Sequence, residues 1–169
     1  AVHLLGEPVG RNTAPCIGLG ALYAEGLGCK SPFAFMPADH YIADVPGFLK
    51  ALQRAEEAAS AGGIVTLGIV PTRPETGYGY IRRGGVSSTD GEAPVYEVSQ
   101  FVEKPDARKA LEYMQTREYY WNAGIFVAAP DVILEEIRVC LPELHEGLED
   151  LRPALGTDTF EREMEKTYH

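Results

Sequence analysis

Residues 7–15 form the first of four polar clusters whose side chains could bind a ligand. This cluster contains Glu7, Arg11, Asn12 and Thr13, just before an apolar segment with helical spacing. A helix start offers free N–H groups and a positive dipole end, and Arg11 adds donors, so an anionic or carbonyl-rich ligand suits the cluster. Glu7 is an acceptor and matches the N1–H and N2–H₂ donors of guanine. The alternative is a helix capped by Asn12 or Thr13, with solvated charges around it.

Asp39 belongs to the second cluster, Pro37-Ala38-Asp39-His40, which follows a short apolar segment. A carboxylate after a buried strand can hold Mg²⁺ that bridges substrate phosphates, because this ion prefers one or two carboxylates and keeps several waters. The alternative is an aspartate that stabilises a turn or caps a helix. We interpret His40 as a packing or hydrogen-bonding residue without a chemical role.

The third and fourth clusters contain groups that suit a phosphorylated sugar. Glu103 and Lys104 follow a predicted strand, where Glu103 could accept hydrogen bonds from hydroxyls and Lys104 could contact a phosphate. Alone, this pair is also typical of a solvated corner. Asn122 stands in the aromatic segment 119–124, which could form a sugar-sized wall with a two-way amide. Half-buried core aromatics explain that segment equally well.

Short apolar segments alternate with helical patterns, which predicts an α/β fold with a mixed, mostly parallel sheet flanked by helices. We expect strands at 2–5, 33–36, 64–70, 80–81, 95–102 and 124–128, and helices starting near 13, 46, 106, 130, 142 and 157. Segment 64–70 should be central and covered on both faces, 95–102 edge-like, and 82–93 a hairpin tip or mobile excursion. Open α/β sheets bind ligands at the carboxyl ends of strands, so Asp39 and Lys104 should converge on one cleft.

Composition predicts one soluble globular domain over residues 1–169. Hydrophobic residues make up 45% and charged residues 24%, which excludes a disordered chain. The net charge of −10 disfavours nucleic acids and anionic membranes as partners. We find no apolar run that could span a bilayer and no signal peptide, so we expect a cytoplasmic protein. Cys16, Cys29 and Cys140 are interpreted as buried thiols, because their spacing fits neither a disulfide framework nor a zinc site.

Five sequence motifs occur in order along almost the whole chain: GEPVGRNTAP at 6–15, PADHYI at 37–42, IVTLGIVPTRPETGYGYI at 64–81, FVEKPD at 101–106 and YYWNAGIF at 119–126. Together they resemble the mannose-1-phosphate guanylyltransferase family of sugar nucleotidyltransferases. The resemblance implies a Rossmann-like nucleotidyltransferase fold that makes GDP-mannose and pyrophosphate from GTP and mannose 1-phosphate, with Mg²⁺ as cofactor. GTP and mannose 1-phosphate are the partners that it implies.

The resemblance also assigns roles to nine residues. The nucleotide would be bound by Glu7, Arg11, Asn12 and Thr13, of which Glu7 and Asn12 would face the guanine. Asp39 would hold the metal, and Lys104 would bind the sugar phosphate; both would act in catalysis. The sugar would be bound by Gly79, Glu103 and Asn122. The glycine matters because a missing side chain lets backbone approach a ligand closely.

Two departures from the family pattern lead to further expectations. The family carries a loop of the form Gly-x-Gly-x-Arg-x-x-Pro and a second metal aspartate in a Ser-Ile-Asp-Tyr-like word, and this sequence, which begins at Ala1, contains neither. We therefore expect an internal fragment that lacks the N-terminal strand-loop unit, has little or no transferase activity alone and forms a homo-oligomer. The alternatives are a non-catalytic sugar-phosphate-binding or assembly module, and a transferase for another sugar 1-phosphate or base.

Overall fold

The computed structural model describes residues 2–88 and 93–168, which fall into two compact units. The helical unit combines Ala1–Phe33, Gly62–Ile64 and Ala128–His169, and the sheet unit combines Ala34–Ala61 and Val65–Val127. Each unit is built from segments distant in sequence.

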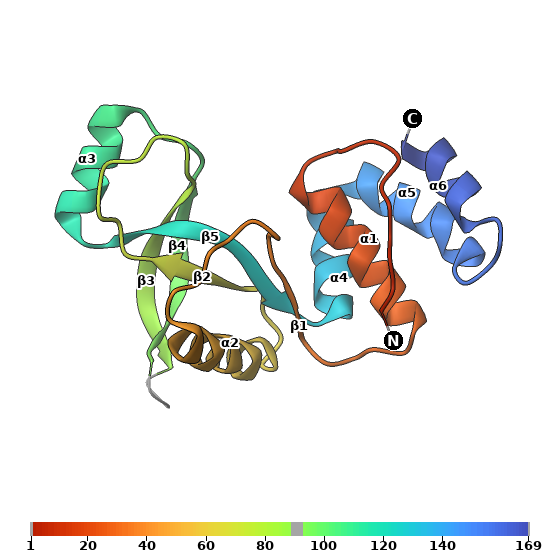
Figure 1. Ribbon diagram of the computed structural model, residues 1–169, viewed down its shortest axis with the longest axis horizontal. Coiled ribbons are helices and arrows are strands. Elements are labelled where there is room, and N and C mark those ends of the chain that lie inside the picture. The colour runs from red at the N-terminus through yellow and green to blue at the C-terminus, as the bar shows by residue number, and fades with distance from the viewer. Residues whose placement is uncertain (1, 89–92, 169) are drawn as a thin grey trace. The chain divides into compact units, whose positions relative to one another are not determined.

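A five-stranded sheet forms the centre of the sheet unit (Figure 1). Its strands are β1 (Phe33–Phe35), β2 (Val65–Ile69), β3 (Tyr80–Ser88), β4 (Val95–Val102) and β5 (Tyr119–Ala128). The strand order is β1-β5-β3-β4, and β2 also pairs with β5. The expected α/β class is confirmed, but β2–β5, β3–β4 and β3–β5 are all antiparallel, so the prediction of a mostly parallel sheet was wrong for these pairs.

Other strands also differ from expectation: β5 begins at Tyr119, earlier than the strand expected at 124–128, and β2 and β3 differ as follows. Segment 64–70 was predicted to be central and covered on both faces, but β2 is only half-buried to exposed and pairs with β5 alone. Its apolar composition is typical of a buried parallel strand, yet Ile69 remains 48% exposed. Segment 82–93 was predicted to be a hairpin tip or mobile excursion, but its residues 82–88 extend β3 and pair with β4, while positions 89–92 lie outside the described residues. The edge position predicted for 95–102 is confirmed, because β4 ends the strand order.

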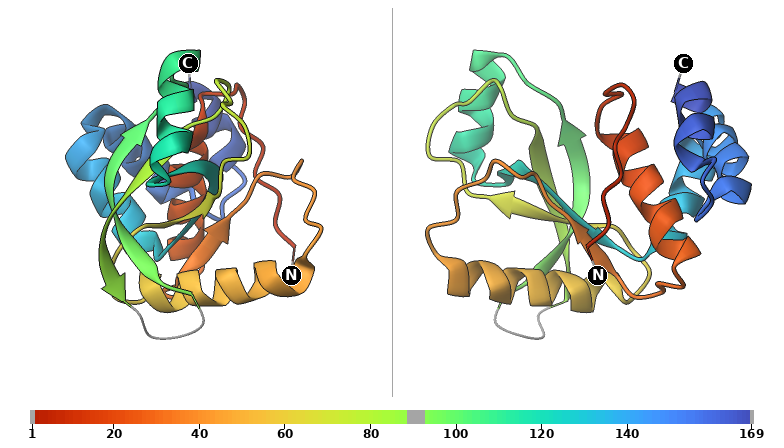
Figure 2. Two further views of the ribbon diagram at one scale, coloured as in Figure 1. Left: turned by 90° about the vertical axis from the view of Figure 1, so that its left-hand side faces the viewer. Right: turned by 45° about the vertical axis from the view of Figure 1, so that its right-hand side comes forward.

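Two helices pack on this sheet. Helix α3 (Ala107–Thr116) begins after Asp106, whose Oδ1 accepts from the Lys109 N–H at 2.8 Å, as predicted for a cap. It contributes Ala110 to a core with Tyr80, Tyr119 and Trp121. Helix α2 (Val45–Ala59) lies across the lower end of the strands in both views of Figure 2 and forms a second core through Ala55, Ala59 and Val127.

The helical unit contains α1 (Thr13–Gly26), α4 (Pro130–Cys140), α5 (Pro142–Leu151), the short 3-10 helix η1 (Arg152–Ala154) and α6 (Phe160–Tyr168). Helix α1 packs on α4 and α5, and α6 packs on α5. Gly18 makes the first packing possible, since a Cβ there would lie 2.9 Å from Cδ1 of both Ile137 and Leu148. The helices predicted to start at the two prolines, Pro130 and Pro142, are confirmed.

Three smaller predictions fail in the helical unit. Segment 2–5 is not a strand, because none of the described residues pairs with it. The cysteines are not buried thiols: Cys16 and Cys140 are exposed and Cys29 is half-exposed. Asn12 precedes α1, but its side chain makes no capping hydrogen bond. Among residues 2–88 and 93–168, no helix is long and apolar enough to cross a membrane.

Candidate functional site

The start of β3 and the end of β4 lie side by side, which brings three predicted sugar-binding residues together. Tyr80 is in register with Val102 of β4 and Trp121 of β5, so Gly79, Glu103 and Asn122 are neighbours. The Asn122 N–H donates to the Gly79 carbonyl at 2.8 Å. A Cβ on Gly79 would lie 3.0 Å from Glu103 Oε2, which shows how closely the carboxylate approaches the backbone.

Lys104 extends from the same corner in an uncommon backbone conformation. Its φ is 42°, in the left-handed region that residues with a Cβ rarely adopt. Its Nζ lies 3.2 Å from Glu103 Oε1, and both side chains are more than 60% exposed, at 63% and 61%. An ion pair so open to water contributes little to stability, so either charge can exchange its partner for a ligand.

The Asn122 amide is held by two donors within the sheet unit. Its Oδ1 accepts from Thr66 Oγ1 at 2.9 Å and from the Gly124 N–H at 3.3 Å. The acceptor end of the amide is therefore engaged, and its NH₂ group is the end left for a ligand. The sequence suggested a two-way hydrogen-bonding group, whereas this arrangement favours donation to sugar oxygens.

Arg73 is a cationic residue in this neighbourhood that our sequence analysis missed. Its guanidinium lies 5.5 Å from the centroid of the Trp121 ring, and Tyr78 packs edge-on against the same ring at 5.3 Å. The Trp121 Nε1 is buried and has no partner among the described residues. Arg73 also pairs with Glu75, whose pKa lies below its usual value because the Gly77 N–H and Arg73 hydrogen-bond the carboxylate.

Asp39, the predicted metal ligand, stands in a turn after β1 and is exposed. The turn reaches β5, since a Cβ on Gly124 would lie 3.5 Å from Pro37 Cγ. Within the described part of the chain, no hydrogen bond or ion pair engages the Asp39 carboxylate, and no group of three or more potential ligands surrounds it. One free carboxylate fits Mg²⁺ that takes its other ligands from substrate phosphates and water. A cleft shared by Asp39 and Lys104 stays a prediction.

The four predicted nucleotide-binding residues lie in the helical unit. Glu7 Oε1 accepts a hydrogen bond from the Tyr168 hydroxyl at 3.1 Å, and Arg11 Nη2 donates to the Tyr168 carbonyl at 2.6 Å. Thr13 is the first residue of α1. Because Asn12 has φ 70° and leaves the helix start uncapped, N–H groups of the first turn remain available to an anion.

Glu7 influences two titratable neighbours. The pKa of Tyr168 is raised well above its usual value, first because the phenol is buried and then because the Glu7 charge disfavours a phenolate. The pKa of the Cys16 thiol is also raised, first by partial desolvation, although the residue as a whole is exposed, and then by the Glu7 charge. Both groups are therefore held in their neutral forms near pH 7. No local pattern in the sequence points to the contact between Glu7 and Tyr168, which are 161 positions apart.

Comparison with known proteins shows the family to which the chain belongs. Residues 1–155 match the nucleotidyl transferase family, and the chain belongs to that family. The described fold is also similar to a crystal structure named mannose-1-phosphate geranyltransferase from Thermus thermophilus, with a TM-score of 0.84 and 41% identity over 99% of this chain and 46% of that one.

Within this family, the chain is similar to curated proteins that share one name. A mannose-1-phosphate guanylyltransferase of Escherichia coli K12 is 44% identical over 92% of this chain, and one of Klebsiella pneumoniae is 46% identical over 86%. The chain spans about a third of the length of these relatives. The resemblance of the five sequence motifs to the mannose-1-phosphate guanylyltransferase family is thereby confirmed.

Proposed function

We propose that the chain supplies part of a mannose-1-phosphate guanylyltransferase, which joins GTP and mannose 1-phosphate into GDP-mannose with release of pyrophosphate. The observation that carries the proposal is the corner where Gly79, Glu103, Lys104 and Asn122 meet. It offers an acceptor for hydroxyls, amide donors and an exposed ammonium group within one small region. The names of the curated relatives support the same substrates.

In the proposed reaction, a phosphate oxygen of mannose 1-phosphate attacks the α-phosphorus of GTP in line, and the bond to the β-phosphate oxygen breaks. Lys104 holds the sugar phosphate, while Glu103 accepts from sugar hydroxyls and Asn122 donates to sugar oxygens. Mg²⁺ held by Asp39 would neutralise charge on the phosphates. Catalysis is thus mainly positioning and electrostatic stabilisation.

The helical unit would hold the nucleotide. Glu7 accepts from the guanine edge, and Arg11 with the uncapped N–H groups of α1 attracts phosphate oxygens. With a net charge of −10, the chain depends on such local donors to bind an anion.

Substrate binding in the protein expressed from its full reading frame tests the proposal. We expect pyrophosphate release from GTP with mannose 1-phosphate to exceed release with ATP or UTP. Glu103→Gln should raise the KM for mannose 1-phosphate about tenfold, because one charged acceptor is lost. Glu97→Gln is the control, since Glu97 is exposed on β4 away from the corner. Equal KM values for both variants would contradict the role of Glu103.

We also propose that the 169-residue polypeptide by itself turns over slowly. Its sequence lacks the Gly-rich, Arg-containing loop and the second metal aspartate of the family pattern, and losing even one such stabilising group costs roughly 3 kcal/mol. We expect pyrophosphate release at least about a hundredfold below that of the longer relatives. Turnover comparable to theirs would refute this expectation.

A further inference from the structure

Tyr168 connects the two groups that the proposed function assigns to opposite ends of the nucleotide. Its hydroxyl donates to Glu7, and its carbonyl accepts from Arg11. The side chain is 8% exposed and lies at the end of α6, far along the chain from both partners. One residue thus ties the predicted base acceptor and the predicted phosphate donor to the same helix.

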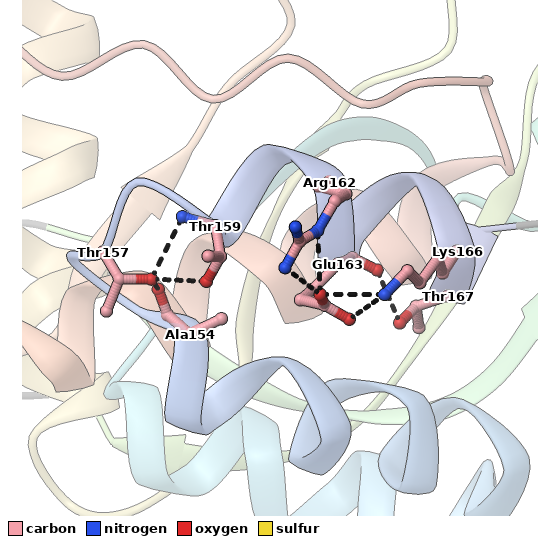
Figure 3. Close-up of polar contacts among 7 residues, drawn as sticks. All are labelled: Ala154, Thr157, Thr159, Arg162, Glu163, Lys166 and Thr167. Carbon is pink, nitrogen blue, oxygen red and sulfur yellow. Dashed lines mark hydrogen bonds and ion pairs between the residues drawn. The ribbon is translucent and has the colours of Figure 1, made fainter.

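Tyr168 is the last residue of helix α6. Figure 3 shows the polar contacts before the first turn and on the exposed side of this helix. Its buried face consists of Phe160, Met164 and Tyr168, at the spacing of successive helical turns. Before its first turn, Thr157 Oγ1 accepts from the Thr159 N–H at 3.3 Å. Its exposed side carries Glu163 between Arg162 and Lys166, with Lys166 Nζ 2.9 Å from the carboxylate. The packing of this buried face, rather than the exposed ion pairs, holds the helix that carries Tyr168.

We propose that Tyr168 is a positioning residue for nucleotide recognition: its hydroxyl orients the Glu7 carboxylate toward the base, and its carbonyl orients Arg11 toward the phosphates. The inference rests on the proposed function, which assigns base recognition to Glu7. Tyr168 acts through these two side chains and has no contact with the reacting atoms.

Hydrogen-bond capacity favours positioning over blocking. A carboxylate has about four acceptor sites, of which Tyr168 occupies one and the Cys16 thiol another, so Glu7 retains about two for the two donors of a guanine edge. The Arg11 guanidinium has about five N–H donors and uses one on the Tyr168 carbonyl. Both side chains are therefore oriented by Tyr168 and still have hydrogen-bonding sites available for the nucleotide. Burial of the phenol strengthens the contact, because few waters compete for the hydroxyl.

Nucleotide binding by the protein from its full reading frame tests the inference, with GTP and ITP as probes. ITP lacks the 2-amino group, so the ratio of the two affinities reports how well Glu7 meets the guanine edge. We expect Tyr168→Phe to weaken GTP binding about fivefold to tenfold and ITP binding by less than twofold. Tyr23→Phe is the matched control, since its hydroxyl contacts His3 Nδ1 at 3.0 Å in the same unit, and it should leave both affinities unchanged.

The possible outcomes separate the inference from the proposed function. If Glu7→Gln weakens GTP binding but Tyr168→Phe leaves the GTP/ITP ratio unchanged, the positioning role is wrong and base recognition by Glu7 stands. Equal weakening of GTP and ITP in Tyr168→Phe would show a merely structural role and would also overturn the inference. If Glu7→Gln has no effect, or the wild type binds ATP as tightly as GTP, base recognition by Glu7 falls, and the inference with it.

Discussion

Lys104 combines a strained backbone with a proposed phosphate contact, so substitutions there should separate stability from binding. Its φ of 42° costs a residue with a Cβ about 1–2 kcal/mol relative to right-handed conformations. Glycine avoids this cost but loses about 0.5–1 kcal/mol more conformational entropy on folding. We therefore expect Lys104→Gly to be more stable than Lys104→Ala by about 0.5–1 kcal/mol.

The ion pair with Glu103 does not affect this comparison. Both side chains are more than 60% exposed, at 63% for Lys104 and 61% for Glu103, and both variants lose the pair equally. Such exposed pairs contribute about 0–1 kcal/mol. The order of stability between the two variants therefore reports the backbone conformation alone.

Binding should change in the same direction for both variants. A charge-assisted hydrogen bond to a phosphate contributes about 1.5–3 kcal/mol, so the affinity for mannose 1-phosphate should fall by a factor of about 10–150. Urea unfolding would measure stability, and titration calorimetry would measure binding. Lys104→Gly would then be the more stable variant and still bind poorly, which is typical of strain kept at a functional site.

Arg117 offers a matched control in the sheet unit. It follows α3 with φ 56° and has no proposed role in binding. Arg117→Gly should also be more stable than Arg117→Ala, by a similar amount, while both retain wild-type affinity for mannose 1-phosphate. If Lys104→Ala is at least as stable as Lys104→Gly, the strain argument is wrong. Unchanged affinity in both Lys104 variants would refute the phosphate contact.

Three further perturbations test packing, capping and titration. Gly18→Ala gains about 1 kcal/mol of helix propensity but overpacks α1 against α4 and α5 by about 1–3 kcal/mol, so the urea midpoint should fall; a higher midpoint would contradict this. Asp106→Ala removes the cap of α3 and should lower the free energy of unfolding by about 1 kcal/mol, measured against Glu112→Ala, an exposed position in the interior of the same helix, as control. The raised pKa of Tyr168 stabilises the fold below its unfolded pKa of about 10, so the stability advantage of wild type over Tyr168→Phe should disappear as pH rises above that value; a constant difference would oppose it.

Local signals in the sequence predicted most of the elements well. Asp106 marks the start of α3, and Pro130 and Pro142 mark the starts of α4 and α5, because caps and N-terminal prolines act within one helical turn. The alternation in 95–102 identified an edge strand for the same reason, since it depends on one strand only. These features need no knowledge of distant residues.

Features that depend on distant residues were missed. The apolar composition of 64–70 is compatible with a buried strand, but exposure depends on which elements cover β2. The contact of Tyr168 with Glu7 joins opposite ends of the chain, and neither residue carries a local signal for it. Likewise, only the structure shows that Thr66 engages the Asn122 oxygen and thereby limits what the amide can bind.

The antiparallel pairing of β3 with β4 is the correction that matters most for the candidate site. Gly79 precedes a strand, whereas Glu103 and Lys104 follow one. In a parallel pair these positions would lie at opposite ends of the two strands, about a strand length apart. Antiparallel pairing puts Tyr80 opposite Val102, so the start of one strand meets the end of the other. The resemblance grouped these residues by role, and only antiparallel pairing makes that grouping physically possible.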